Sequence, residues 1–481
     1  MPSPLQPSPT ILLPDLPPKT LVGIDLITFS STANFHGIRD LPVGWHFLYT
    51  GTTESLSLRC GAWFYVGDIR ATGHGDSNTA LVVAQESKIG PQIYIWKWNA
   101  GIESLASLKS GSDADCQEAM RHKANLGAVW QRGGLFRYRS RVSAAMLSNK
   151  PGSTPAETTI AEEDEESEQI GRRDWRQLTD RISPDILSRI LGDCEMDVDG
   201  HPRWTVTSAS TANRDADHIP GVDSPAEVPQ ETQAPAEEQE REFQFLPVDL
   251  KRTWREGAIG RERTEGAQDR SWALADLIIR YSSRVSGEIT VDEQTGEAQL
   301  LGELQFTFLV VLTLMNFSCL QQWKRLLELI LTCRRAIVDR EAFIAEALRI
   351  LLRQLQRCDD VEGGLFEIDG DEGGEFLRQL LIKVRRSVDE VVEIGASSMV
   401  RDELNKLKAW VKEEYDWELQ RESIVRRGML RLEDGEEVEM ELDDNDEDEE
   451  TGEYAPVVVD LEEHDALSED EEASDLEDMR Y

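Results

Sequence analysis

The chain has 481 residues, 40% of them hydrophobic, which is enough for two or three domains with buried cores. Its formal charge at pH 7 is −41, and residues 433–481 hold 25 acidic residues and one basic residue. Affinity for nucleic acid depends on Lys and Arg that neutralise phosphates. The composition therefore argues against direct nucleic-acid binding and favours basic protein surfaces as partners.

Cysteine spacing and the apolar segments bear on cofactors and location. The six cysteines form no C-x-x-C pair, and no histidine stands beside them at zinc-ligand spacing. We expect reduced thiols and no cofactor, as in cytosolic or nuclear proteins. The N-terminus lacks the basic and apolar regions of a signal peptide. The longest apolar stretch, residues 304–320, is short for a membrane span, so we expect a core helix and no membrane contact.

The first half of the chain has the pattern of a β-rich domain. Residues 1–10 are rich in Pro and Ser and are predicted to be disordered. Short apolar or aromatic runs separated by Gly, Pro, Ser and Asn then indicate strands. The predicted strands are Thr20–Phe29, Trp45–Tyr49, Ala62–Val66, Ala80–Ala84 and Ile93–Trp98. In the last run isoleucines alternate with aromatic residues, which predicts a sheet packed on both faces or a sheet with one aromatic surface for a partner.

The boundaries of this domain come from changes in composition. We place it at residues 11–203, with a disordered acidic insert near residues 150–170. Ser183 and Pro184 precede an apolar run and predict the N-cap and first turn of a short helix. Residues 204–242 are dominated by Ala, Pro, Glu and Gln and are predicted to be a disordered linker.

After residue 243 the apolar residues recur at helical spacing. Stretch 304–320 is apolar all round, so it predicts a central helix. Further amphipathic stretches begin near Trp323, Phe343, Leu377 and Leu404. They predict an all-α domain over residues 243–430, interrupted by an acidic loop at 359–375. The whole reads as an α+β multidomain protein: two independently folded domains, then an acidic disordered tail at residues 431–481.

A search for chemistry finds little. The sequence contains no P-loop, no G-x-S-x-G and no H-E-x-x-H motif. His36 and His46 stand near Asp25, Asp40 and Cys60 and could form a site. A catalytic or metal site also needs positioned supporting groups. We therefore favour the interpretation that these are residues of sheet and turns, and we predict no catalytic or metal-binding residues.

Two stretches carry a family resemblance. Residues 23–26 (GIDL) lead to residues 35–47 (FHGIRDLPVGWHF), in which two glycines suit turns and a proline stiffens the approach to the next strand. Residues 301–308 (LGELQFTF) lead to residues 322–327 (QWKRLL), and Glu303 is expected near a helix N-terminus. Both stretches resemble the A1 cistron-splicing factor family.

The resemblance implies a β-rich N-terminal domain, a helical C-terminal domain and no catalysis. Members of that family bind the large scaffold protein of the U5 small nuclear ribonucleoprotein during its assembly. They contact its RNase H-like and Jab1/MPN-like domains and keep the spliceosomal helicase off the scaffold until maturation in the nucleus. We therefore expect a pre-mRNA splicing factor found in cytoplasm and nucleus. The alternative is a general acidic chaperone that shields basic proteins.

The acidic tail holds two candidate sites. Three successive valines are strongly strand-prone, so we expect the segment around them to add as a strand to a sheet edge of the scaffold. The contact residues would be Tyr454, Val457, Val458, Val459 and Leu461. The alternative is an apolar accident in a disordered tail.

Ser468 and Ser474 each precede acidic residues and resemble substrates of an acid-directed kinase. A phosphate would add about −1.5 to −2 charges. The sequence leaves the direction of its effect open, and an unmodified tail is the alternative.

Overall fold

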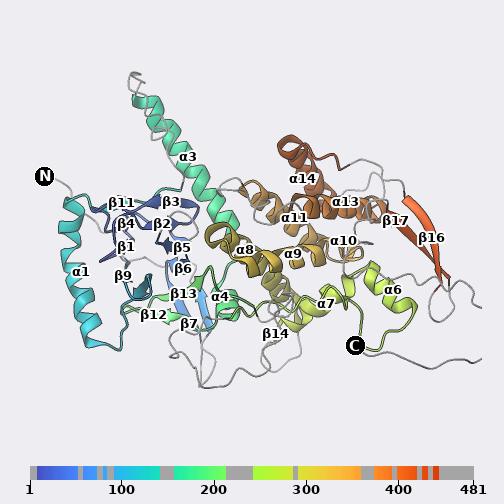
Figure 1. Ribbon diagram of the computed structural model, residues 1–481, viewed down its shortest axis with the longest axis horizontal. Coiled ribbons are helices and arrows are strands. Elements are labelled where there is room, and N and C mark those ends of the chain that lie inside the picture. The colour runs from blue at the N-terminus through green and yellow to red at the C-terminus, as the bar shows by residue number, and fades with distance from the viewer. Residues whose placement is uncertain are drawn as a thin grey trace, which may run out of the picture. The chain divides into compact units, whose positions relative to one another are not determined.

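The computed structural model describes residues 8–52, 58–72, 80–83, 92–140, 157–212, 242–284, 291–358, 373–392, 398–419, 425–431 and 437–443. The chain divides into a compact unit spanning residues 1–419 and a second unit spanning residues 420–481. Within the first unit a β-rich N-terminal region is followed by a helical C-terminal region (Figure 1). The predicted α+β class and the order of its two regions are confirmed.

Two sheets form the N-terminal region, of which the first is mixed and the second is antiparallel. The first sheet contains, in spatial order, β10 (Ser104–Ser107), β9 (Ile93–Asn99), β1 (Thr10–Leu12), β4 (Gly37–Arg39) and β11 (Leu135–Arg137). The second contains β12 (Glu195–Met196), β13 (Pro202–Thr207), β6 (Arg59–Val66), β5 (Gly44–Gly51), β2 (Leu21–Ile24) and β3 (Ile27–Ser30). A separate two-stranded ladder joins β7 (Ile69–Thr72) to β8 (Ala80–Val83).

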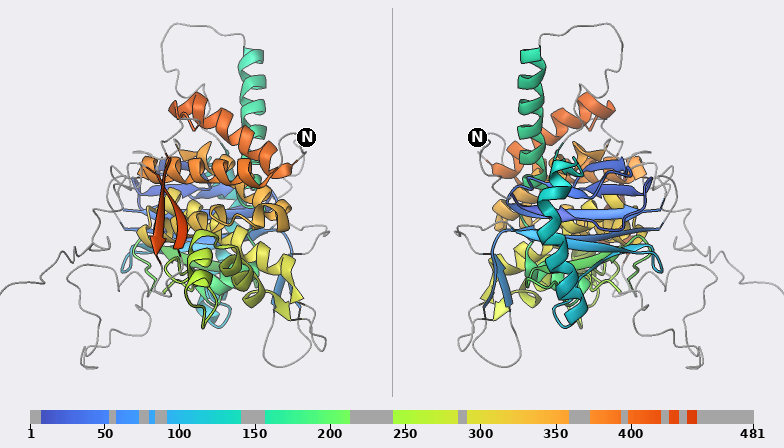
Figure 2. Two further views of the ribbon diagram at one scale, coloured as in Figure 1. Left: turned by 90° about the vertical axis from the view of Figure 1, so that its right-hand side faces the viewer. Right: turned by 90° about the vertical axis from the view of Figure 1, so that its left-hand side faces the viewer.

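The two sheets pack face to face, and each has a second covered face. Phe64 of β6 lies between Tyr94 and Trp96 of β9, with ring centroids 5.1 Å away in both cases. The isoleucine between them, Ile95, points to the other side and packs with Leu126 of α1 (Asp113–Gln131). Helix α1 therefore crosses the outer face of the first sheet (Figure 2). The predicted alternation in β9 and the packing of its sheet on both faces are confirmed.

The helical region is organised around one buried helix. Its helices are α6 (Arg261–Gln268), α7 (Ser271–Arg280), α8 (Glu293–Leu314), α9 (Phe317–Leu331), α10 (Ala336–Asp339), α11 (Glu341–Leu355), α13 (Gly373–Val391) and α14 (Met399–Tyr415), with short strands β14 (Ser283–Arg284) and β15 (Val291–Asp292). Every residue of α8 from Leu300 to Leu314 is buried. Among the described residues, α8 alone is long and apolar enough to span a membrane, but 83% of that window is buried inside the protein. It is a core helix, as the apolar sequence predicted.

A single hydrophobic core joins the two regions. Trp63 of the second sheet packs against Trp175 of α3 (Glu157–Leu178) and against Phe306 of α8, with centroids 6.1 and 6.2 Å away. Trp204 of β13 and Leu304 of α8 belong to the same cluster. The sheet and helix α8 bury one another within one unit, whereas we expected two independently folded domains.

One helix of the β-rich region meets α8 closely. Helix α4 (Pro184–Leu191) begins at the predicted N-cap, where the hydroxyl of Ser183 accepts from the Ile186 N–H. Gly302 of α8 faces it, and a Cβ at that position would lie 2.2 Å from Cδ1 of Ile186 and 2.8 Å from the backbone carbonyl oxygen of Arg181. Glycine is therefore required there by the close approach of α4 and α8.

Several predicted boundaries are corrected by the structure. Strand β1 begins at Thr10, and the sheet continues past residue 203 because Trp204 of β13 is fully buried against the core. Helix α3 covers much of the insert near 150–170, since Glu-rich sequence favours helix and the last turns of α3 are anchored by buried Trp175 and Leu178. Helix α13 starts two residues before the end of the predicted loop.

The end of the helical region and the start of the tail also differ from expectation. Strand β16 (Val425–Arg431) pairs antiparallel with β17 (Glu437–Asp443) in the second unit. Strand pairing therefore occurs where we expected the last helical residues and the first part of a disordered tail. The remaining parts of the predicted linker, loop and tail lie outside the described residues.

Two predicted elements are each divided by a residue with positive φ. Thr20–Phe29 is a hairpin of β2 and β3, because Asp25 turns the chain at φ 56°. Stretch 304–320 is divided at Met315, with φ 55°, into α8 and α9. Asn316 then caps α9 by accepting from the Cys319 N–H at 2.9 Å.

Candidate functional site

The buried carboxylate of Glu303 connects the two regions. Its Oε2 accepts from Nη1 of Arg189 on α4 at 2.7 Å, and its Oε1 accepts from Nε2 of Gln322 on α9 at 2.7 Å. The backbone N–H of Leu246 donates to both oxygens at 3.1 Å. Three donors from three segments thus make four hydrogen bonds to a side chain that is 0% exposed. The expectation that Glu303 stabilises a helix N-terminus is wrong, because it lies in the middle of α8.

Two glutamines continue this polar contact along α8 and its neighbours. Oε1 of Gln305 accepts from the Arg181 N–H at 2.9 Å, and its Nε2 donates to Oδ1 of Asp180 at 2.7 Å, just after α3 ends. Gln354 of α11 accepts from Nε1 of Trp323 and donates to the Leu304 carbonyl, both at 3.0 Å. Buried polar groups with complete partners fix one arrangement of the surrounding elements. The two regions are therefore held in one orientation.

A second buried network occupies the space between the sheets. Oδ2 of Asp25 accepts from the Tyr138 hydroxyl at 2.6 Å and lies 2.9 Å from Nδ1 of His46. Its Oδ1 accepts from the Phe47 N–H at 2.9 Å. Nε2 of His46 lies 2.8 Å from the Pro42 carbonyl. Because both ring nitrogens face acceptors, the protonated imidazolium is the form that satisfies them.

The burial of this network indicates a structural role. His46 is 1% exposed and Asp25 is 2% exposed, so neither presents a reacting atom to solvent. Of the residues that the sequence placed near one another, the structure brings together Asp25 and His46. Asp40 instead pairs with Arg39 at 2.6 Å. The interpretation of these groups as sheet and turn residues agrees with their positions.

The protonation of His46 is set by opposing effects. Burial lowers the pKa of His46, but the Asp25 carboxylate and the hydrogen bonds to Asp25 and the Pro42 carbonyl raise it, against a further lowering by Arg172. The pKa is raised overall, since the ring sits between a carboxylate and a carbonyl. The same carboxylate, together with burial, raises the pKa of Tyr138 well above its usual value, so the phenol stays a donor.

Stability should fall as His46 loses its proton. A folded pKa above the unfolded value of about 6.5 means that the contribution is complete below about pH 6.5 and is lost as the pH rises through the folded pKa. We expect the free energy of unfolding of the wild type to decrease over that window. The His46→Gln variant should be less stable and should lack this component of the decrease. Denaturant unfolding of both proteins across the window measures it, and parallel curves would contradict the assignment.

One group of potential metal ligands is present among the described residues: Asp197, Asp199 and His201. Asp197 Oδ1 accepts from the N–H groups of Asp199 and His201, and its Oδ2 lies 3.0 Å from Nδ1 of His201. Lys123 donates to Asp199 at 2.6 Å. The group forms the turn between β12 and β13, and these contacts explain it.

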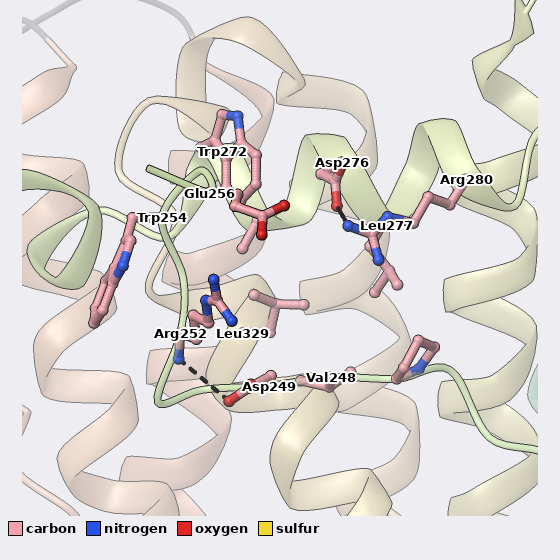
Figure 3. Close-up of a pocket in the computed structure, with 12 residues that line it drawn as sticks. Val248, Asp249, Arg252, Trp254, Glu256, Trp272, Asp276, Leu277, Arg280 and Leu329 are labelled. Atoms are coloured by element: carbon pink, nitrogen blue, oxygen red, sulfur yellow. Dashed lines mark hydrogen bonds and ion pairs between the residues drawn. The ribbon is translucent and has the colours of Figure 1, made fainter. Parts of the chain in front are cut away.

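The helical region carries an open cleft of about 330 Å³. Its walls are the extended segment 247–256, helix α7 and Leu329 of α9 (Figure 3). Trp272 on α7 lies at the edge of the cleft and is 42% exposed. Ile279, two turns further along α7, is 50% exposed. A large aromatic side chain left in solvent beside a cavity is typical of a protein contact.

The polar lining of the cleft is mixed. Arg252 and Glu256 point into it (Figure 3), and Asp276 pairs with Arg280 across one turn of α7 at 2.5 Å. The cavity is therefore suited to both charged and apolar side chains of a partner protein. Its lining residues show no pairing of a nucleophile with a base. The helical spacing of the apolar residues did not single out Trp272 as an exposed side chain. Trp272 and Ile279 are seven residues apart and therefore lie on the same side of α7. That side is opposite the one that carries the buried Leu274 and Ile278, and this spacing is the sequence signal for the exposure of Trp272.

The predicted contact residues of the tail cannot be compared with this site. Tyr454, Val457, Val458, Val459 and Leu461, and the predicted phosphorylation sites Ser468 and Ser474, lie outside the described residues. Strand addition and phosphorylation therefore stay predictions.

Comparison with known families agrees with the architecture. The AAR2 N-terminal domain matches residues 7–192, and the AAR2 C-terminal repeat region matches residues 245–420. The curated proteins gave no match to the chain. The first match covers the β-rich region and the second covers the helical region with its cleft, so together they span most of the chain. The resemblance to the A1 cistron-splicing factors is thus confirmed, and the chain belongs to the AAR2 family.

Proposed function

We propose that this protein binds the large scaffold protein of the U5 small nuclear ribonucleoprotein, through its RNase H-like and Jab1/MPN-like domains, and delays helicase binding. The observation that carries the proposal is the match of both family regions, at residues 7–192 and 245–420. Membership of this family supports a splicing-related role in assembly of that particle, as a protein-binding factor without catalysis.

The shared core supports a mechanism by shape. Because Glu303 and the tryptophan cluster hold the two regions in one orientation, binding to a client with two domains would cost little ordering entropy. A rigid body seated across two client domains excludes another protein from the surface it covers. No bond to the client needs to form or break in this mechanism. We propose that this occurs in the cytoplasm and that the complex is resolved in the nucleus.

A competition experiment tests the proposal. The full chain is mixed with a purified scaffold fragment that contains both domains, and complex formation is followed by size-exclusion chromatography at low and moderate salt. We expect a stoichiometric complex that survives moderate salt and prevents the helicase from joining. Weak, salt-sensitive binding to lysozyme and histones alike would instead favour the acidic chaperone. Helicase that joins freely would contradict the delaying role.

The cleft beside α7 is the part of this body that we assign to the scaffold contact. We expect Trp272→Ala to weaken scaffold binding by about tenfold or more, because an interface tryptophan typically contributes about 2 kcal/mol or more. Trp272 is 42% exposed, so its removal should leave the fold intact. Calorimetric titration measures the effect. Met120→Ala is the matched control, because Met120 is 66% exposed on α1, far along the chain from the cleft. Equal affinities for both variants would exclude the cleft from the contact.

The tail adds a second proposed contact. We expect deletion of residues 450–481 to lower scaffold affinity if Tyr454–Leu461 adds a strand to the scaffold. Calorimetry with the truncated chain measures this, and unchanged affinity would remove the idea. The pair Ser468→Glu and Ser474→Glu tests the proposed phosphorylation, which requires binding to differ from that of the wild type in either direction.

A further inference from the structure

Strand β11 is the last strand of the first sheet. It pairs in parallel with β4, and no other described strand lies beside it. The His36 N–H donates to the Gly134 carbonyl, and the Tyr138 N–H donates to the Arg39 carbonyl, both at 2.8 Å. Backbone groups alternate in direction along a strand. Those of the residues between, Leu135 and Arg137, therefore face the outer edge of the sheet.

The chain around this edge has a charge opposite to that of the whole. Residues 119–156 contain seven Lys or Arg and no Asp or Glu, in a protein of net charge −41. Three of the seven are described and exposed beside the edge: Arg132 at the end of α1, then Arg137 and Arg139. Arg137 is 60% exposed at its side chain. Two residues apart on an extended chain, Arg137 and Arg139 point to the same side.

The described neighbours leave this charge largely uncompensated. Among them, Asp40 is the acidic side chain within reach, but it accepts from Arg39 at 2.6 Å and lies 3.9 Å from Arg137. Arg39 itself stacks over Trp130. On the opposite side of β11, Phe136 is 37% exposed. The edge thus presents arginines on one side and an aromatic ring on the other.

The other outer strands of these two sheets lack this combination. Strands β3 (Ile27–Ser30) and β10 (Ser104–Ser107) contain no charged residue, and β12 (Glu195–Met196) contains an acidic one. Within these two sheets, a basic edge is therefore a particular property of β11.

We propose that β11 binds an extended acidic segment of a partner protein by strand addition. The main chain of that segment pairs with the outward backbone groups of Leu135 and Arg137. Its acidic side chains meet Arg132, Arg137 and Arg139, and apolar side chains at alternate positions meet Phe136. A single-stranded RNA would use the arginines and the ring but would leave the outward backbone groups unpaired, so the geometry favours a peptide. The inference does not depend on the scaffold contact.

The test uses the full chain and a fluorescein-labelled peptide of alternating Glu and Val. Fluorescence anisotropy should show saturable binding. The Arg132→Glu, Arg137→Glu and Arg139→Glu triple variant should bind the peptide at least about tenfold more weakly, because three attractions become repulsions. A matched triple variant, Arg255→Glu, Arg261→Glu and Arg335→Glu, reverses three exposed arginines of the helical region and should bind within about twofold of the wild type. Thermal unfolding of both variants checks that each is folded.

Two further arms separate strand addition from general charge attraction. The same peptide with a methylated backbone keeps its charges but cannot donate hydrogen bonds, so it should bind at least about tenfold more weakly. Equal binding of both peptides would overturn strand addition. Tighter binding of a single-stranded RNA than of the peptide, lost in the first triple variant, would overturn the assignment of the partner. Unchanged peptide binding by the first triple variant would overturn the site itself.

Discussion

Replacing Glu303 with alanine is expected to lower the free energy of unfolding by about 3–5 kcal/mol, the usual cost of removing one partner from a buried charged pair. The variant leaves the Arg189 guanidinium, the Gln322 amide and the Leu246 N–H without their acceptor, in a place where α8 is fully buried. Unfolding in urea, followed by tryptophan fluorescence, measures the change. Because the core is shared, we expect one transition for both regions.

The matched control for this variant is Glu262→Ala. Glu262 pairs with Arg255 at 3.5 Å, and both side chains are more than half exposed. Its loss should change the stability by at most about 0.5 kcal/mol. Similar effects of the two variants would contradict the role of Glu303 as the junction of three segments. Two separate transitions in the wild type would contradict the shared core.

The Asp25→Ala variant should be destabilised by a similar amount, about 3–5 kcal/mol, because it leaves a buried imidazolium without its carboxylate. The Tyr138 hydroxyl and the Phe47 N–H lose their acceptor as well. Alanine at φ 56° adds about 1 kcal/mol of backbone strain. Denaturant unfolding below pH 6.5, where His46 is charged in both the folded and unfolded states, gives the clearest value.

Asp40 provides a close control for Asp25. It also has a positive φ, 62°, and also accepts from a cation, but its side chain is 30% exposed. Asp40→Ala therefore contains the same backbone strain with little of the buried electrostatic loss. The difference between the two variants isolates the buried network. If that difference were below about 1 kcal/mol, the network would contribute no more than an ordinary hydrogen bond.

Local signals in the sequence located most of the elements. The hydroxyl of Ser183 caps α4 as its position before a proline predicts, and the alternation of Ile and aromatic residues in β9 matches its two packed faces. Each of these features is decided within a few residues of chain. Physical rules for strands and helix ends act over that range, so the sequence alone is sufficient.

Features that depend on distant residues were missed. Asp25 turns a hairpin inside a run that reads as one strand, and the donors to its carboxylate include the Tyr138 hydroxyl, more than a hundred residues away. Met315 ends α8 in a left-handed conformation, a position where glycine is the usual residue and the usual sequence signal. The sequence predicted Glu303 as a carboxylate near a helix N-terminus, and its contacts with Arg189 and Leu246 depend on residues far away in the chain. Exposure of Trp272 likewise depends on which side of α7 the core occupies.

The shared core also fixes an order of events during synthesis. When the ribosome has released the chain as far as β13, the face of the second sheet with Trp63 and Trp204 is complete and is partly covered by α3 and α4, but the part that packs against α8 is still exposed. Helix α8, which brings Phe306 onto that face, emerges about ninety residues later. A nascent chain therefore exposes an aromatic surface for several seconds, at translation rates of about 5–20 residues per second, and would depend on chaperones until α8 arrives.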